Sequence, residues 1–298
     1  MHRERTSALD LGLLAAPLPA VLIGAAVMSR VDVPPALWGA DLAAAGAGMG
    51  VAWAAGRWHP RAVSRRRATP WLLAGALALL AATLAFPGID GVRRWVPAGP
   101  LALHAGAIVI PPLFVMLSRT GAVVSAAAAL AVMGILLLQP DAAQAWAFAA
   151  GWTVLAVATR GRAAAIPAAA VVLVAAVTLL RADPLAPVPH VEGSVGLAVA
   201  QGRVWGGASV LALVAPPIVL ALTPDRAAGT TLAAYFACTL VAAALGSFPV
   251  PFLGYGVSPI LGYYLGIAGL APDLARVSAA APLPVPTPPG RAPGVASP

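Results

Sequence analysis

Long apolar runs, separated by short polar segments, recur along almost the whole 298-residue chain. Each run comes close to the ~20 apolar residues that an α-helix needs to cross a bilayer. Ala, Gly, Leu and Val dominate these runs, and small residues let helices pack closely in lipid. The pattern predicts an all-α, polytopic transmembrane helical bundle of about ten spans. They lie near residues 9–28, 37–55, 71–86, 101–117, 121–138, 142–158, 163–181, 207–223, 228–247 and 256–272.

Composition supports a membrane protein and argues against a soluble one. Apolar residues make up 60% of the chain and charged residues 9%, whereas a soluble domain is about half apolar and a quarter charged. The net charge of +8 comes from Arg alone, and these Arg residues stand between the apolar runs. The expected surrounding is therefore the lipid bilayer, and nucleic-acid binding is not expected. The one cysteine, Cys238, excludes an internal disulfide and a CxxC site.

The distribution of Arg predicts the orientation of the bundle. With the N-terminus in the cytoplasm, 13 of the 18 Arg fall on the inner side and 5 on the outer side. This asymmetry follows the positive-inside rule and predicts that both termini are cytoplasmic. We expect residues 1–275 to form the transmembrane domain. Residues 276–298 are rich in proline and small residues, which predicts a disordered cytoplasmic tail.

The predicted outer loop at residues 87–97 contains two adjacent basic residues, Arg93 and Arg94, followed by Trp95. Guanidinium groups bind phosphate through paired hydrogen bonds, so these residues could hold a lipid phosphate at the outer face. They could equally form an Arg-Trp anchor that reaches to the lipid headgroups. The pattern alone leaves both interpretations open.

Two further outer segments carry polar residues. Gln139-Pro140-Asp141 has the character of a helix start, with Asp141 as the cap. The segment 181–207 is polar and glycine-rich around an apolar stretch at 195–200, which predicts a short re-entrant or interfacial helix. His190 in this segment has no partner at ligand spacing, so we predict no metal site.

A break in the apolar pattern at residues 246–259 is the clearest pointer to a cavity. Three Pro and three Gly occur within these fourteen residues. Irregular backbone at membrane depth persists only where it is buried in protein or lines a cavity. Asp41, the one clear acid within a span, is expected at the membrane interface rather than in a proton relay. The residues predicted to line the cavity are Pro249, Pro251, Gly254, Tyr255, Gly256 and Ser258.

Four of these segments, in this order, resemble motifs of the FtsW/RodA/SpoVE (SEDS) family. Residues 91–95 match its G-x-R-R-W loop, and residues 139–141 match its Q-P-D. Residues 182–207 echo its A-D-P-L and glycine-rich stretch, and residues 250–259 match its P-F-x-S-Y-G-G-S-S segment. The chain is therefore similar to a short, divergent member of this family.

The resemblance implies a bacterial cytoplasmic-membrane protein that acts in peptidoglycan assembly during cell division or cell-shape maintenance. Family members are glycosyltransferases that polymerise lipid II on an undecaprenyl diphosphate carrier, alongside a class B penicillin-binding protein. By this resemblance Arg93, Arg94 and Trp95 hold the sugar diphosphate. No cofactor is predicted, and a divalent cation is an option only if the chain is catalytically active.

Two departures from the family leave polymerase activity open. The Glu and Lys of the family's Q-P-S-E-x-x-K motif align with apolar residues within 104–110, and the H-T-D-F loop with the catalytic acid is missing before the next span. Asp183 and Glu192 are the candidates to replace that acid. The alternatives are a non-catalytic docking or regulatory partner of a class B penicillin-binding protein, and a small-molecule transporter that uses the 249–259 break as its site.

Overall fold

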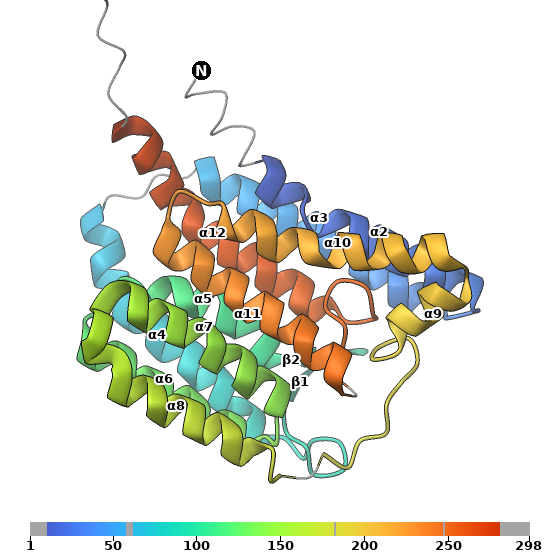
Figure 1. The fold of residues 1–298 in the computed structure, drawn as a ribbon, viewed down its shortest axis with the longest axis horizontal. Coiled ribbons are helices and arrows are strands. Elements are labelled where there is room, and N and C mark those ends of the chain that lie inside the picture. Colours follow the sequence, from blue (N-terminus) through green and yellow to red (C-terminus); the bar gives the residue numbers. More distant parts are fainter. Residues whose placement is uncertain (1–10, 58–61, 182, 247, 281–298) are drawn as a thin grey trace, which may run out of the picture.

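The computed structural model describes residues 11–57, 62–181, 183–246 and 248–280 as a bundle of helices with one β-hairpin (Figure 1). Its helices are α2 (Leu18–Arg30), α3 (Pro35–Arg57), α4 (Ala62–Ala82), α5 (Ala105–Leu117), α6 (Ala122–Leu138), α7 (Ala142–Arg160), α8 (Ala165–Thr178), α9 (Ser194–Ala200), α10 (Arg203–Ala221), α11 (Arg226–Leu245) and α12 (Val257–Ala280). Two 3-10 turns, η1 (Thr83–Ala85) and η2 (Gly161–Ala164), follow α4 and α7. The hairpin pairs β1 (Trp95–Ala98) with β2 (Leu101–His104).

Helix α12 is central to the packing, since it contacts both α3 and α5, while α7 packs along α11. Small residues permit these approaches. A Cβ on Gly262 of α12 would lie 1.9 Å from the carbonyl oxygen of Ala107 on α5. A Cβ on Gly48 of α3 would lie 2.6 Å from the ring of Tyr264 on α12. The abundance of small residues in the sequence therefore has a direct packing consequence.

The surface of the bundle is apolar, as expected of a membrane protein. Large apolar side chains such as Trp71, Ile166 and Leu245 are at least 80% exposed, and soluble proteins rarely expose so much apolar surface. Within the part of the chain that the structure describes, four helical stretches are long and apolar enough to cross a membrane, and four further apolar helices are shorter. The predicted all-α membrane bundle is confirmed, and the number of spans stays a prediction.

Each predicted span falls on a helix, with differences at the ends. The span expected near residues 101–117 starts only at Ala105, because residues 101–104 form β2. The short helix expected around 195–200 is α9. Helix α12 continues to Ala280, and the rest of the predicted tail, residues 281–298, lies outside the described residues.

Candidate functional site

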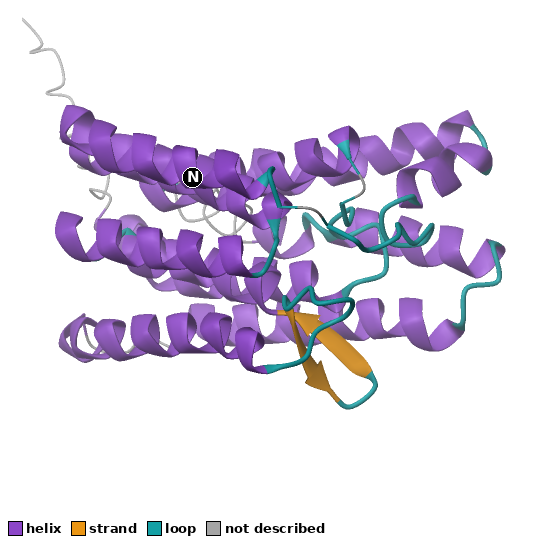
Figure 2. Ribbon diagram, turned by 90° about the horizontal axis from the view of Figure 1, so that it is seen from below, coloured by secondary structure: helices purple, strands orange, loops and turns teal. Residues whose placement is uncertain are grey.

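The hairpin and the loops that surround it meet between the ends of several helices (Figure 2). The chain enters the hairpin through a tight turn at Gly88, whose φ of 75° suits glycine. A second turn follows, in which Asp90 and Gly91 have positive φ (47° and 81°) and Ile89 pairs with Val92. Arg93 is exposed and donates to the Leu84 carbonyl oxygen (3.3 Å), whereas Arg94 is only 4% exposed. The two adjacent arginines therefore have different surroundings.

Arg94 lies between two carboxylates. Its Nη2 donates to Asp183, and its Nη1 is 3.7 Å from Oδ1 of Asp141. Asp141 is 1% exposed and also accepts a hydrogen bond from the backbone N–H of Gln144 (3.2 Å), so it caps helix α7. The helix cap expected from the sequence is present, and the same side chain belongs to a buried charge cluster.

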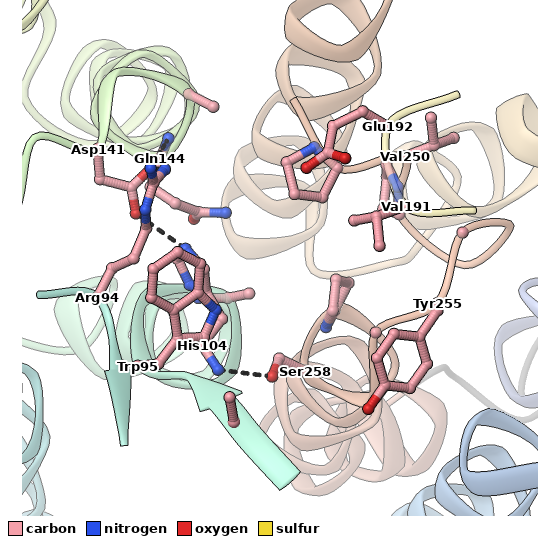
Figure 3. A pocket seen from close by; sticks show the side chains of 18 of the residues that line it. Arg94, Trp95, His104, Asp141, Gln144, Val191, Glu192, Val250, Tyr255 and Ser258 are labelled. Atoms are coloured by element: carbon pink, nitrogen blue, oxygen red, sulfur yellow. Dashed lines mark hydrogen bonds and ion pairs between the residues drawn. The ribbon is translucent and has the colours of Figure 1, made fainter. Parts of the chain in front are cut away.

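His104 connects this cluster to helices α5 and α12. Its Nε2 is 3.0 Å from Oδ2 of Asp141 (Figure 3). Its Nδ1 accepts a hydrogen bond from the backbone N–H of Ala107 (3.2 Å), and its backbone N–H donates to Oγ of Ser258 (2.8 Å). This network assigns the ring proton to Nε2. With Nδ1 held by the Ala107 N–H and Nε2 facing the Asp141 carboxylate, His104 positions Asp141.

Asp141 is a fixed counter-ion. Burial alone raises the pKa of its carboxyl group, but His104, Arg94 and the N–H of Gln144 together outweigh burial and leave the pKa below its ordinary value. The carboxylate therefore stays ionised at neutral pH. Its role is to hold Arg94 and His104 in place.

A cavity of about 460 Å³ opens beside this cluster. One wall carries Arg94, His104 and Asp141, and the facing wall is built from the loop before α9 and the break before α12 (Figure 3). The cavity combines a charged side with apolar and backbone surfaces, as ligand sites commonly do. All six residues expected from the break line it: Pro249, Pro251, Gly254, Tyr255, Gly256 and Ser258.

Comparison with known proteins identifies the fold. No protein-family model and no curated protein matches the chain in sequence. Its structure is similar to the rod shape determining protein RodA of Thermus thermophilus, with a TM-score of 0.59 over 89% of this chain and 96% of that chain, at 22% identity. A variant of the same RodA, with an aspartate replaced by alanine, gives a TM-score of 0.57 at the same coverage and identity. The chain has the RodA fold.

A further structure with this fold was described for the coordination of polymerization and crosslinking by a peptidoglycan synthase complex. The TM-score is 0.58 over 91% of this chain and 98% of that chain, again at 22% identity. The match to RodA and to this complex therefore extends over nearly the whole length of both chains. The fold implied by the sequence motifs is confirmed.

Within this RodA fold, the candidate site residues divide into two groups. Trp95 lines the cavity with Arg94, and its ring centroid is 4.9 Å from the Arg94 Cζ atom. Glu192 also lines the cavity, where its Oε2 accepts a hydrogen bond from the Val188 N–H (2.6 Å). Asp183 reaches the cavity indirectly, through its ion pair with Arg94. Arg93 lies apart from this group and points outward.

Asp41 has a partner that the sequence did not reveal. It is 2% exposed within the bundle, and its Oδ1 accepts a hydrogen bond from the backbone N–H of Gly256 (3.2 Å); its place at the membrane interface stays a prediction. That partner is 215 positions away in the sequence, so no local pattern reveals the contact. Asp41 fastens the break that forms one cavity wall to helix α3.

Sequence reasoning also missed the pairing of His104 with Asp141. The Q-P-D motif pointed to Asp141 as a cap but carried no sign of its ion partners.

In this RodA-like chain, the position where the family's catalytic loop would follow the glycine-rich stretch is helical. That stretch ends at Gly207, which lies inside α10 (Arg203–Ala221), so the chain continues as helix there. Among the described residues, no group of three or more His, Cys, Asp or Glu side chains is placed to hold a metal ion. The divalent cation of an active enzyme stays a prediction, and no step is assigned to one.

Proposed function

We propose that this chain is a SEDS-like protein of the bacterial cytoplasmic membrane that acts in peptidoglycan assembly. In this proposal the cavity binds a lipid-linked sugar diphosphate of the lipid II type. The observation that carries it is the buried guanidinium group of Arg94 in the cavity wall. The motif resemblance and the RodA fold support the same assignment.

Arg94 has the properties of an anion ligand. Its planar group offers paired N–H donors that match phosphate oxygens. Its Nε is buried and has no hydrogen-bond partner among the described residues. Because the site is largely screened from water, a charge-assisted hydrogen bond there is stronger than at the surface. We therefore assign the diphosphate to Arg94 and not to Arg93.

The hydrocarbon chain of the ligand has a suitable place nearby. A smaller cavity of about 230 Å³ is lined by α10 and α11 side chains that include Leu213 and Leu240. It shares Glu192 and Val250 with the main cavity, so the two are adjacent. A molecule with a charged head and an apolar chain would bury each part in matching surroundings. This arrangement favours a lipid-linked diphosphate over a soluble one.

If the chain catalyses glycosyl transfer, we assign the general base to Glu192. A base must come within hydrogen-bond reach of the acceptor hydroxyl, and Glu192 lines the cavity. Asp183, the other candidate, is not among the residues that line the cavity and reaches it only through Arg94. The proposed partner is a class B penicillin-binding protein, in keeping with the similarity to a chain from a peptidoglycan synthase complex.

A second candidate function is a non-catalytic partner that docks or regulates such a transpeptidase. The continuous helix α10 favours it, because the chain stays helical after Gly207, where the family's catalytic loop would follow. This candidate predicts that the chain co-purifies with a transpeptidase and binds the lipid but makes no glycan strands.

The test is binding of lipid II to the chain in nanodiscs, compared with undecaprenol, which has the same hydrocarbon chain and no phosphate. We expect lipid II to bind at least about tenfold more tightly, because only it can engage Arg94. Equal binding, or none, would overturn the proposed site and leave solute transport to be tested by flux. A polymerisation assay with the transpeptidase then separates the enzyme from the docking protein.

A further inference from the structure

The two carboxylates on Arg94 differ in how firmly they are held. Asp141 is 1% exposed and contacts His104 and the N–H of Gln144 in addition to Arg94. The side chain of Asp183 is 31% exposed. Beyond Arg94, its carboxylate accepts a hydrogen bond from Leu185, two residues along the same loop (3.2 Å). Asp183 can therefore leave Arg94 at a far smaller cost than Asp141 can.

Asp183 belongs to the irregular loop between α8 and α9, which forms part of the cavity wall. Towards its end the loop is held by backbone hydrogen bonds to the break before α12: Val250 donates to Val191 (3.2 Å) and Tyr255 donates to His190 (2.7 Å). Towards its start the Arg94–Asp183 ion pair holds it. A charged contact thus fastens one part of the wall and backbone contacts fasten the other.

A phosphate that approaches Arg94 from the cavity would place a third anion beside one guanidinium group. Like charges at such short distances repel strongly in a site with little water. This repulsion falls if one of the two carboxylates moves into solvent, and the partly exposed Asp183 is the one that can do so.

From this geometry we propose that Asp183 is a built-in competitor for the anion site on Arg94, displaced when a lipid-linked phosphate binds. The inference rests on the proposed function of the cavity. Two consequences follow: removing the charge of Asp183 strengthens binding, and binding releases the start of the loop. Affinity then reflects the exchange of one anion for another, and not the phosphate contact alone.

The experiment measures binding of undecaprenyl diphosphate to the full chain in nanodiscs, for the wild type, Asp183→Asn and Asp90→Asn. Asp90 is a matched control, because it lines the same cavity but is outside the Arg94 ion pairs among the described residues. Its φ is 47°, a conformation that Asn also tolerates. We expect Asp183→Asn to tighten binding at least about tenfold and Asp90→Asn to change it less than about threefold.

A second readout is tryptic cleavage after Arg181, which is exposed two residues before Asp183. We expect the ligand to speed this cleavage in the wild type, and the ligand-free Asp183→Asn variant to be cleaved as fast as the ligand-bound wild type. If the wild type binds and Asp183→Asn binds no more tightly, the competitor role is wrong while the site stands. If neither protein binds, both the site and the competitor role are wrong.

Discussion

The two walls of the cavity are built in different ways. On one wall, the side chains of Arg94 and His104 contact the carboxylate of Asp141 in a buried cluster. On the other, the loop before α9 and the break before α12 are joined through backbone hydrogen bonds, such as that from Tyr255 to His190. The first wall supplies charge and the second supplies shape. We therefore expect substitutions on the first wall to act through lost charge interactions and substitutions on the second wall to act through disturbed packing.

Close backbone approach also marks the second wall. A Cβ on Gly254 would lie 2.3 Å from the carbonyl oxygen of Val191. The buried Phe252 has a φ of 68°, unusual for a bulky residue, and packs against Phe236 and Tyr263. Such a conformation persists only where the surroundings hold it in place. The shape of this wall thus depends on packing behind it.

The largest effect is expected from Asp141→Ala on the charged wall. It removes a helix cap and leaves the buried Arg94 and His104 without their shared carboxylate, which should cost about 3–5 kcal/mol of folding free energy. The matched control is Asp225→Ala, which removes a cap from α11 where Asp225 accepts from the Ala228 N–H (3.1 Å). Loss of a cap alone costs about 1 kcal/mol. Thermal unfolding in detergent measures both, and equal losses would show that the charge cluster adds nothing.

On the second wall, Gly254→Ala should cost about 1–3 kcal/mol of folding free energy. The added methyl group would collide with the backbone of Val191 and not with a movable side chain. Gly256→Ala is the matched control two residues along. Its Cβ would meet only Pro259, at an ordinary 3.9 Å, and its N–H could still bond Asp41. Unfolding midpoints and lipid II affinity check the pair, and a Gly254→Ala protein as stable as Gly256→Ala would contradict the close approach.

A smaller effect is expected where the two walls meet. Ser258→Ala removes the acceptor of the His104 backbone N–H, at a cost of about 1 kcal/mol. Ser118→Ala is the comparison, because the Ser118 hydroxyl donates to the carbonyl oxygen of Val115, one turn earlier at the end of helix α5. We expect it to change stability by less than about 0.5 kcal/mol. Chemical denaturation measures both, and a neutral Ser258→Ala would remove this link between the walls.

The helices and the cavity-forming break were predictable from local sequence. Apolar runs set the helices, and the cluster of Pro and Gly at 246–259 set the break. The hairpin was not predictable, because residues 101–104 continue the apolar run of α5 and a short apolar stretch does not distinguish strand from helix. The four residues become β2 through pairing with β1.

The charged site was only partly predictable. Arg94 and Trp95 could be selected from the loop motif, but the different positions of Arg93 and Arg94 depend on the turn between Gly88 and β1 and on contacts with distant segments. The partners of Asp141 and Asp41 come from segments far along the chain. Sequence patterns report local periodicity, whereas ion pairs between loops arise only in the folded bundle.

The most direct test of the central claim compares lipid II binding by Arg94→Gln and Arg93→Gln in nanodiscs. The two residues are adjacent and equally charged, and only Arg94 lines the cavity. Arg94→Lys keeps the positive charge but lacks the planar guanidinium group with its paired N–H donors. It therefore serves as a control for a folding defect caused by the loss of charge in Arg94→Gln. We predict that Arg94→Gln weakens binding at least about tenfold, or ~1.4 kcal/mol, and that Arg93→Gln leaves it unchanged. Equal effects of the two substitutions, or wild-type binding by Arg94→Gln, would contradict the account.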